Sequence, residues 1–356
     1  MLETLKTLVA QTQQAGGFDL NIKVGAPPTV RIAGGIRHTV GRAFSLDEMK
    51  QFISNLLDKE TYYKFQHHGQ VDTILSLDDC RLRINTFIQR GSPSLSVRII
   101  PSKIPKLEDC GLPDYLVAQI NDARSGLILV TGATNSGKST TQAAIIDHIC
   151  RKRSVHVITI EDPIEYKFPE YENSIISQRH VGVHTNDFQT ALNSALRQDP
   201  DVIVIGELRN PETVTTCLQA AETGHLVMGT LHTMSSAQSI SRLVNIFPSD
   251  RTDAVRYGIA NCLKLVISQV LLRGIDQKSR VLAYELMPTT GAIANLIRTN
   301  RVHEINSLLL AGKKFGGCLM QQSIQELLKN KKIRYEDVPS EYNLKVKPTG
   351  GLDGNS

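Results

Sequence analysis

Residues 132–139, GATNSGKS, have the types and spacing that can hold a phosphate group. Gly132 and Gly137 let the backbone curve closely enough for its N–H groups to surround phosphate oxygens, and Lys138 adds a positive charge. The hydroxyl of Ser139 is suited to Mg²⁺. The pattern GxxxxGK[ST] therefore predicts a phosphate-binding loop, against the alternative of a glycine-rich turn with an incidental lysine.

The segments on either side of this loop favour the phosphate-binding interpretation. An apolar run, LILVT (127–131), precedes it, and a stretch with helical composition, TTQAAIIDHICRK (140–152), follows it. A loop between a strand and a helix places the phosphate at the positive end of the helix. A strand before residues 132–139 and a helix after them are therefore the surroundings expected of a phosphate-binding loop.

Carboxylates come at the end of the next apolar run, in TIEDPIEY (159–166). Glu161 and Asp162 stand where the strand 155–160 is expected to end, at the edge on which α/β sheets bind ligands. Either carboxylate could order a water molecule or accept its proton. The alternative is that Asp162-Pro163 only ends the strand in a turn.

A third segment, DPDVIVIGELRNPETV (199–214), is an apolar strand that ends in Glu207. This is the form of a Walker B segment, whose carboxylate reaches Mg²⁺ directly or through water. Gly206 precedes it where a second acidic residue often stands, so the division of roles between Glu161 and Glu207 stays open. Asp199 and Asp201 fit a turn before the strand better than a site.

The fourth segment is ETGHLVMGTLHT (222–233), in which His232 follows an apolar strand. His232 could contact the terminal phosphate, although a lone histidine beside a strand is more often structural. Its place after the fourth of four phosphate-related segments favours the functional interpretation. His225, at the start of the same run, is interpreted as structural.

The elements that must position these side chains alternate between strand and helix. Apolar runs at 127–131, 155–160, 202–205 and 226–231 are typical of strands buried on both faces, and helical stretches at 140–152 and 211–224 lie between them. This alternation predicts a parallel α/β sheet. Residues 250–340 are expected to be mostly helical, with apolar periodicity over 254–272 and 323–332.

The first hundred residues have a different pattern, with short alternating runs that predict a small α+β domain with a mainly antiparallel sheet. The runs are 18–25, 29–34, 71–77, 81–89 and 94–100. A helix is expected over 45–66, where Ser45 and Glu48 have capping-box spacing. The domains predicted are therefore 1–100, a proline-bracketed linker at 101–113, a domain over 114–345 and a disordered tail at 346–356.

The amino-acid composition disfavours several classes of function. The chain has 356 residues, is 41% hydrophobic and carries 40 Lys and Arg against 35 Asp and Glu, which is too apolar for a disordered chain and too evenly charged to indicate a polyanion binder. Only 5% of residues are aromatic, which disfavours binding of single strands by base stacking. The six cysteines lie at least 30 residues apart, so no zinc-ligand spacing occurs. Without a signal peptide or a membrane-length apolar run, a cytoplasmic protein is expected.

The four segments in this order resemble the Walker A, Asp box, Walker B and His box of the secretion-superfamily ATPases. Within that superfamily the chain is similar to the PilT group, the type IV pilus retraction motors. The likeness extends beyond these boxes and covers nearly the whole chain up to about residue 340. Further segments that carry it are GAPPTVRIAGGI (25–36), RLRINTFIQRG (81–91), SVRIIPSKIPKLEDCGL (96–112), SQVLL (268–272) and AIANLIR (292–298).

The resemblance implies a PAS-like N-terminal domain followed by a RecA-like P-loop ATPase domain, assembled as a homo-hexamer with ATP and Mg²⁺. By position, Glu161 matches the water-activating glutamate, Glu207 the Walker B glutamate and His232 the His-box histidine. Ser139 and Glu207 would hold Mg²⁺, Glu207 directly or through water. The residues expected to contact nucleotide are Gly132, Ala133, Thr134, Asn135, Ser136, Gly137, Lys138, Ser139 and Thr140.

Three arginines of the first domain match positions from which the family directs charge toward the nucleotide. They are Arg81, Arg83 and Arg98. Arg81 and Arg83 are two residues apart and share one face of a strand; the alternative for each is a solvated strand face. Arginine placed against developing charge favours phosphoryl transfer.

The partners implied are an inner-membrane pilus platform protein and, indirectly, pilin, with the hexamer at the inner face of the cytoplasmic membrane. Two departures from the family affect this interpretation. Asn135 replaces a loop glycine, and asparagine tolerates the backbone angles required there. Ala294 and Thr299 replace Arg and Glu in a segment associated with retraction rather than hydrolysis.

Three other functions stay open at this point. An assembly or secretion ATPase of the same superfamily is disfavoured by the missing four-cysteine zinc motif and by the short N-terminal region. A RecA-like nucleic-acid translocase is disfavoured by the balanced charge. The third alternative is a nucleotide-dependent switch with little turnover.

Overall fold

The computed structural model describes residues 2–32, 35–38, 41–277, 279–311 and 316–342. The predicted disordered tail, 346–356, lies outside these residues. The chain divides into two compact units, one of Met1–Lys103 with Asp276–Ser279 and a larger one that holds Ile104–Ile275 and Arg280–Ser356. Each unit has its own sheet and its own apolar core.

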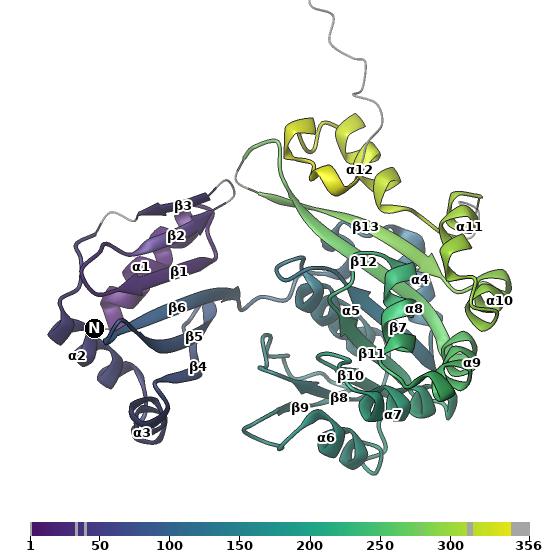
Figure 1. The fold of residues 1–356 in the computed structure, drawn as a ribbon, viewed down its shortest axis with the longest axis horizontal. Helices are drawn as coiled ribbons and strands as arrows, with labels where there is room; N and C mark the ends of the chain where they lie inside the picture. Colours follow the sequence, from purple (N-terminus) through teal and green to yellow (C-terminus); the bar gives the residue numbers. More distant parts are fainter. Residues whose placement is uncertain (1, 33–34, 39–40, 278, 312–315, 343–356) are drawn as a thin grey trace, which may run out of the picture. The chain divides into compact units, whose positions relative to one another are not determined.

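The first unit is an α+β fold built on a six-stranded sheet in the order β3-β2-β1-β6-β5-β4, with every pair antiparallel (Figure 1). Its elements are α1 (Leu2–Gln14), β1 (Asp19–Lys23), β2 (Thr29–Ile32), β3 (Gly35–His38), α2 (Leu46–Leu56), α3 (Lys59–His68), β4 (Gln70–Ser76), β5 (Cys80–Gln89) and β6 (Ser92–Pro101). Alternate residues of the strands pack against the helices: Leu82 and Ile84 of β5 lie in a core with Leu5 of α1 and Phe52 of α2. The predicted antiparallel domain is confirmed.

The single helix expected over 45–66 is wrong in one respect, because α2 ends at Leu56 and α3 begins at Lys59. Ser45 and Glu48 form the predicted capping box at the start of α2. Asp58 then accepts a hydrogen bond from the backbone N–H of Thr61 and caps α3. A polar side chain that competes for backbone donors thus divides a segment whose apolar periodicity is continuous.

The second unit is an α/β fold around a seven-stranded sheet in the order β13-β12-β7-β11-β10-β8-β9. All neighbouring strands are parallel except β13, which is antiparallel to β12. The elements up to the fifth strand of this sheet are α4 (Asp114–Asp122), β7 (Gly126–Thr131), α5 (Lys138–Lys152), β8 (His156–Glu161), β9 (Ile175–His180), α6 (Phe188–Ala195), β10 (Val202–Ile205), α7 (Pro211–Glu222) and β11 (Leu226–Leu231). The remaining elements are α8 (Ser236–Asn245), α9 (Thr252–Cys262), β12 (Leu263–Arg273), β13 (Arg280–Pro288), α10 (Gly291–Arg298), α11 (Ile305–Ala311) and α12 (Met320–Lys329).

The sheet of the second unit is covered on both faces, as its continuous apolar strands predict. In β7, Leu127 and Leu129 belong to a core with α6 to α10, whereas Ile128 and Val130 belong to a second core with α4 and α5. Successive side chains of one strand therefore fill two different cores. The predicted strands β7, β8, β10 and β11 and the predicted fold class are confirmed.

The helix expected over 254–272 is wrong in its second half. Helix α9 ends at Cys262, and the chain continues directly into β12, which pairs with β7 on one side and β13 on the other. Residues 250–340 are therefore less helical than expected. A strand buried on both faces is apolar throughout, and its periodicity does not distinguish it from a buried helix.

Two apolar residues of the expected linker, 101–113, belong to the core of the second unit. Leu107 of a 3-10 turn, Leu107–Cys110, and Leu112 are 1% and 5% exposed and pack beside α4 and α5. The unit boundary falls at residues 103 and 104, so the segment after it is part of the second unit.

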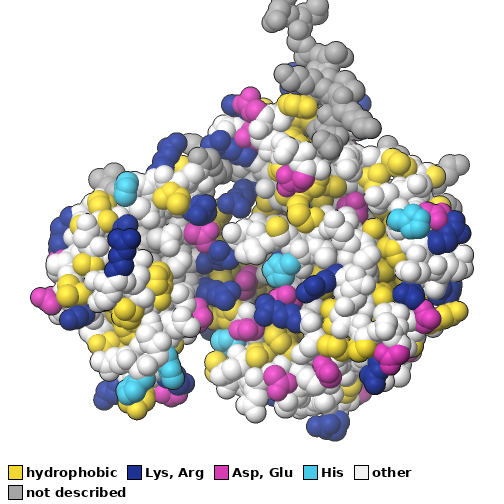
Figure 2. All heavy atoms as spheres, viewed as in Figure 1, with side chains coloured by type: hydrophobic (Ala, Val, Ile, Leu, Met, Phe, Trp, Pro, Cys, Tyr) yellow, Lys and Arg dark blue, Asp and Glu magenta, His cyan; other side chains and the backbone are white. Residues whose placement is uncertain are grey.

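Lys and Arg side chains are interspersed with Asp and Glu side chains on the face of the molecule in view (Figure 2). The described residues include no helix with the length and hydropathy that crossing a bilayer requires.

A buried carboxylate connects two helices of the second unit. Glu285 of β13 is 3% exposed, and its Oε1 accepts a hydrogen bond of 2.7 Å from the backbone N–H of Ser236, at the start of α8. The backbone of Met320, at the start of α12, also acts to lower the pKa of this carboxyl, against the larger effect of burial, which raises it. One acidic side chain therefore satisfies a donor at the start of α8 and lies beside the positive end of α12.

We expect Glu285→Ala to destabilise the second unit by about 2–4 kcal/mol, because it leaves buried N–H groups unpaired and opens a cavity. Thermal unfolding followed by circular dichroism measures this loss. Glu326→Ala, on the exposed side of α12, is the matched control and should change the free energy of unfolding by less than about 0.5 kcal/mol. Equal melting temperatures for the two variants would contradict the assigned role of Glu285.

Candidate functional site

The loop between β7 and α5 has a shape that glycine makes possible. A Cβ on Gly132 would lie 2.4 Å from the backbone oxygen of Gln269 in β12 and 2.5 Å from Ser136 Oγ, and φ at Gly132 is +144°. Gly137, at φ +90°, caps the start of α5. Asn135 has φ +68°, which is the backbone conformation that asparagine tolerates at that position.

The polar groups of this loop fit a phosphate. Ser136 is 4% exposed, and its Oγ has no hydrogen-bond partner among the described residues. Lys138 Nζ donates to the backbone oxygens of Gly132 at 2.7 Å and Ala133 at 3.0 Å. Burial lowers the pKa of Lys138, although the nearby carboxylates of Glu207 and Glu165 oppose this shift. Free donors around a glycine-lined turn are the requirement for binding phosphate oxygens.

The first turn of α5 places the hydroxyls expected to act beside the phosphates. Ser139 and Thr140 follow Lys138 in this turn, and Thr134 lies in the loop before it. Thr140 Oγ1 is 2.9 Å from the hydroxyl of Tyr166, which follows β8. This hydrogen bond connects the segment after β8 to α5, the helix that begins at the loop.

Glu161 is the last residue of β8, and its side chain is half-buried. Its Oε1 accepts hydrogen bonds from Thr159 Oγ1 at 2.6 Å and from Gln178 Nε2 at 3.1 Å. Burial raises the pKa of Glu161, and these two donors, with the backbone of Glu165, act in the opposite direction. A carboxyl with a raised pKa at this edge suits proton transfer near neutral pH.

Glu207 lies just beyond β10 in a different electrostatic environment. Its Oε2 is 2.6 Å from Arg209 Nη2 and 3.4 Å from His232 Nε2. Burial acts to raise the pKa of Glu207, but the hydrogen bond and charge of Arg209, followed by the charge of His232, outweigh it and hold the pKa below its ordinary value. Glu207 is therefore kept charged, which suits a metal ligand.

The strand order brings these predicted residues together. Strands β7, β11, β10 and β8 are neighbours, and all run parallel, so Lys138, Glu161, Glu207 and His232 follow the carboxyl ends of adjacent strands. His232 contacts Glu207, and the charges of Glu207 and Lys138 interact. The turn residue Asp201 instead accepts a hydrogen bond from the backbone of His156 at 2.8 Å, a structural role.

Hydroxyl groups connect the strand ends beneath the loop. Thr131 Oγ1 at the end of β7 donates to Ser268 Oγ of β12 at 2.9 Å, and Ser239 of α8 lies 3.5 Å from Thr131 Oγ1. Ser239 is also 2.6 Å from the hydroxyl of Thr233, the neighbour of His232. The phosphate-binding loop and the segment that carries His232 are thus joined through buried polar contacts.

Four side chains that contact the predicted residues were missed by sequence reasoning. They are Thr159, Tyr166, Gln178 and Arg209. Gln178 belongs to β9, a partly exposed edge strand that was not predicted. Arg209 could have been found from its place two residues after Glu207, since opposite charges at a strand end often pair.

The arginines singled out in the first domain lie on neighbouring strands of its sheet. Arg83 of β5 and Arg98 of β6 are paired across the two strands, and Arg81 shares the strand face of Arg83. Arg98 Nε donates to Asp19 Oδ1 at 2.8 Å, which compensates part of its charge. Their action on a nucleotide stays a prediction.

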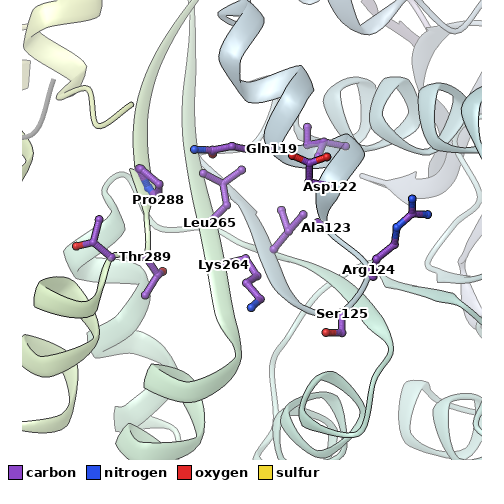
Figure 3. A pocket seen from close by; sticks show the side chains of 12 residues that line it. Gln119, Asp122, Ala123, Arg124, Ser125, Lys264, Leu265, Pro288 and Thr289 are labelled. Carbon is purple, nitrogen blue, oxygen red and sulfur yellow. The ribbon is translucent and has the colours of Figure 1, made fainter. Parts of the chain in front are cut away.

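A cavity of about 570 Å³ lies at the opposite edge of the larger sheet, where β7 and β12 begin (Figure 3). Its lining includes Asp122, Arg124, Ser125 and Lys264. Ligands of open α/β sheets bind at the carboxyl ends of the strands, so the site built around the loop is the stronger candidate.

Comparison with known proteins places the chain among related bacterial ATPases. The family model described as "Type II/IV secretion system protein" matches residues 59–341. The chain is 40% identical to a twitching motility protein of Neisseria gonorrhoeae, over 85% of this chain and 80% of that one. It is 38% identical to the type IV pilus retraction ATPase PilT of Pseudomonas aeruginosa, over 90% of this chain and 92% of that one.

A solved structure agrees with the fold. The crystal structure of the pilus retraction motor PilT with bound ADP superposes with a TM-score of 0.81, at 42% identity, and the match covers 95% of each chain. The family model and the relatives span both units. The chain therefore belongs to the type II/IV secretion system protein family.

Proposed function

We propose that this chain is an Mg²⁺-dependent ATPase that works as a homo-hexameric motor and powers the retraction of a type IV pilus. The observation that carries the proposal is the meeting of Lys138, Glu161 and Glu207 at one sheet edge. The chain around this edge matches a pilus retraction ATPase over 92% of that protein's length. The reaction is the hydrolysis of ATP to ADP and phosphate.

Each strand end has a distinct role in the proposed reaction. The loop of 132–137 surrounds the phosphates, and Lys138 offsets the negative charge that develops on them. Glu161 orients the attacking water and accepts its proton, because partial loss of solvent raises the pKa of its carboxyl. His232 lies next to Glu207 and acts on the terminal phosphate.

The donor set of the site fits Mg²⁺. Ser139 and the charged carboxylate of Glu207 would supply hard oxygen ligands of the kind that this ion takes, Glu207 directly or through water. When bound, Mg²⁺ neutralises charge on the phosphates. Arg209 and His232 keep Glu207 ionised and available for this role.

The first unit is proposed to complete the site. Arg81, Arg83 and Arg98 supply positive charge toward the nucleotide when the two domains close, and hydrolysis releases the closure. The motor acts on an inner-membrane platform protein, and through it on pilin, from the cytoplasmic face of the membrane. No nucleic-acid partner is expected.

One segment differs from what the resemblance leads us to expect of a retraction motor. Ala294 of α10 is 7% exposed and packs in the larger core, and Thr299 follows the helix. An arginine at position 294 would require a different packing of α10.

The first test removes the charge of the phosphate-binding loop. Lys138→Ala should weaken ATP binding about 10- to 100-fold, because a hydrogen bond to a charged group is lost. Fluorescence titration with a labelled ATP analogue measures the affinity. Lys152→Ala, at the other end of α5, is the control and should bind as the wild-type protein does. Unchanged affinity of Lys138→Ala would contradict the site.

The second test separates the two carboxylates. Glu161→Gln should keep ATP affinity and lower kcat by about 10²- to 10⁴-fold, since a general base is lost. Glu207→Gln should weaken the dependence on Mg²⁺ as well as turnover. Steady-state hydrolysis at several Mg²⁺ concentrations distinguishes them. Normal turnover of Glu161→Gln together with an inactive Glu207→Gln would reverse the assigned roles.

The third test examines the direction of movement. Deletion of the gene should give cells that carry more pili and do not retract them, because assembly would continue unopposed. Live imaging of labelled pili measures retraction. Bald cells would instead indicate an assembly motor, and ATP hydrolysis stimulated by DNA would indicate a translocase.

A further inference from the structure

We infer that Gln178 of β9 is a positioning residue that holds the carboxylate of Glu161 in the orientation required to activate water. The inference rests on the proposed function, in which Glu161 is the base. Gln178 itself contacts neither the phosphate-binding loop nor Glu207 in any hydrogen bond of the described residues. It acts through Glu161.

A single amide side chain connects three parts of the site. Gln178 Nε2 donates to Glu161 Oε1 at 3.1 Å and to the backbone oxygen of Tyr166 at 2.9 Å. Gln178 Oε1 accepts from the backbone N–H of Phe168 at 3.4 Å. Both Nε2 and Oε1 of the amide therefore form hydrogen bonds, which restrict the rotation of the side chain.

The pairing of β8 with β9 explains why Gln178 reaches the carboxylate. Thr159 and Gln178 are partners in the parallel register of the two strands, so their side chains lie on the same face. Both donate to the same oxygen of Glu161, Thr159 Oγ1 at 2.6 Å. Two donors from adjacent strands fix that oxygen and thereby the plane of the carboxylate.

The donors also set the charge of Glu161. Burial favours the neutral acid, and a base must be ionised, so hydrogen bonds that stabilise the carboxylate oppose burial. Glu165 adds a negative charge that raises the pKa further. Asp162 is the next residue along the chain, and His180 is the partner of Glu161 in the strand register. Gln178 therefore favours the reactive form.

The segment after β8, to which Gln178 is hydrogen-bonded, also contacts the first turn of α5. Tyr166 OH lies 2.9 Å from Thr140 Oγ1 in the first turn of α5. A path of hydrogen bonds thus runs from Thr140 through Tyr166 and Gln178 to Glu161. The position of the base is in this way tied to the helix expected to hold the phosphates.

The test replaces the amide by a side chain of similar length without donors. Gln178→Met should lower kcat about tenfold at neutral pH, because the base is no longer held in position. KM for ATP should change by less than about twofold, because the orientation of Glu161 affects the chemical step and not the binding of ATP. The acid limb of the kcat profile should move up by about one pH unit, since the lost donor stabilised the ionised carboxylate. Steady-state hydrolysis by the full-length protein from pH 5 to 9 measures both.

Matched variants separate positioning from folding. Gln198→Met, on an exposed turn, should keep the kcat and pH profile of the wild-type protein. Thr159→Val removes the second donor with little change of shape and should move the acid limb in the same direction as Gln178→Met. Among the described residues, Thr159 Oγ1 donates to Glu161, whereas the hydrogen bonds to the backbone of Tyr166 and Phe168 are formed by Gln178. Thr159→Val therefore gives the same readout if Gln178→Met does not fold.

The outcomes distinguish this inference from the proposed function. An unchanged acid limb in both variants, with Glu161→Gln inactive, overturns the positioning role and leaves the proposed base intact. A lower melting temperature with unchanged kcat and pH profile assigns Gln178 to folding alone and also overturns the role. An active Glu161→Gln overturns the assignment of Glu161 as the base and this inference with it, whereas a wild-type protein without ATP hydrolysis overturns the proposed function itself.

Discussion

The close approach of the β7–α5 loop to β12 is the constraint on which the site depends. Gly132 lies so near the Gln269 backbone that any side chain would collide with it. This contact makes the loop turn sharply, so that α5 begins at Lys138 and its positive end faces the carboxyl edge of the sheet. The strand β12, which sequence reasoning interpreted as helix, is therefore one wall of the phosphate-binding loop.

Two carboxylates at the sheet edge beside this loop lie in opposite electrostatic environments. Loss of solvent around Glu161 raises its pKa against the effect of its neutral hydrogen-bond donors, whereas Arg209 and His232 keep Glu207 charged. Two acidic groups of the same chemical type can thereby take different roles, one in proton transfer and one as a metal ligand. Hydroxyl contacts from Thr131 to Thr233 hold the strand ends in fixed relation beneath them.

Sequence patterns predicted the parts of this molecule in which local chemistry and fold agree. The loop around Lys138 and the strands before Glu161 and Glu207 were predicted because glycine spacing and apolar runs are local signals. The strand β12 was mistaken for helix because burial on both faces removes the alternation that marks a strand. Gln178 was missed because its role comes from the register of β8 and β9, which no local pattern encodes.

The proposed mechanism places Glu161 toward the attacking water and Glu207 toward the metal. A structure of the assembled hexamer with Mg²⁺ and a nonhydrolysable ATP analogue tests it most directly. The expected result is a water held by Glu161 in line with the terminal phosphate, Gln178 still bonded to Glu161, and Mg²⁺ near Ser139 and Glu207. A structure in which Glu207 holds that water and Glu161 turns away from the phosphate would contradict the account.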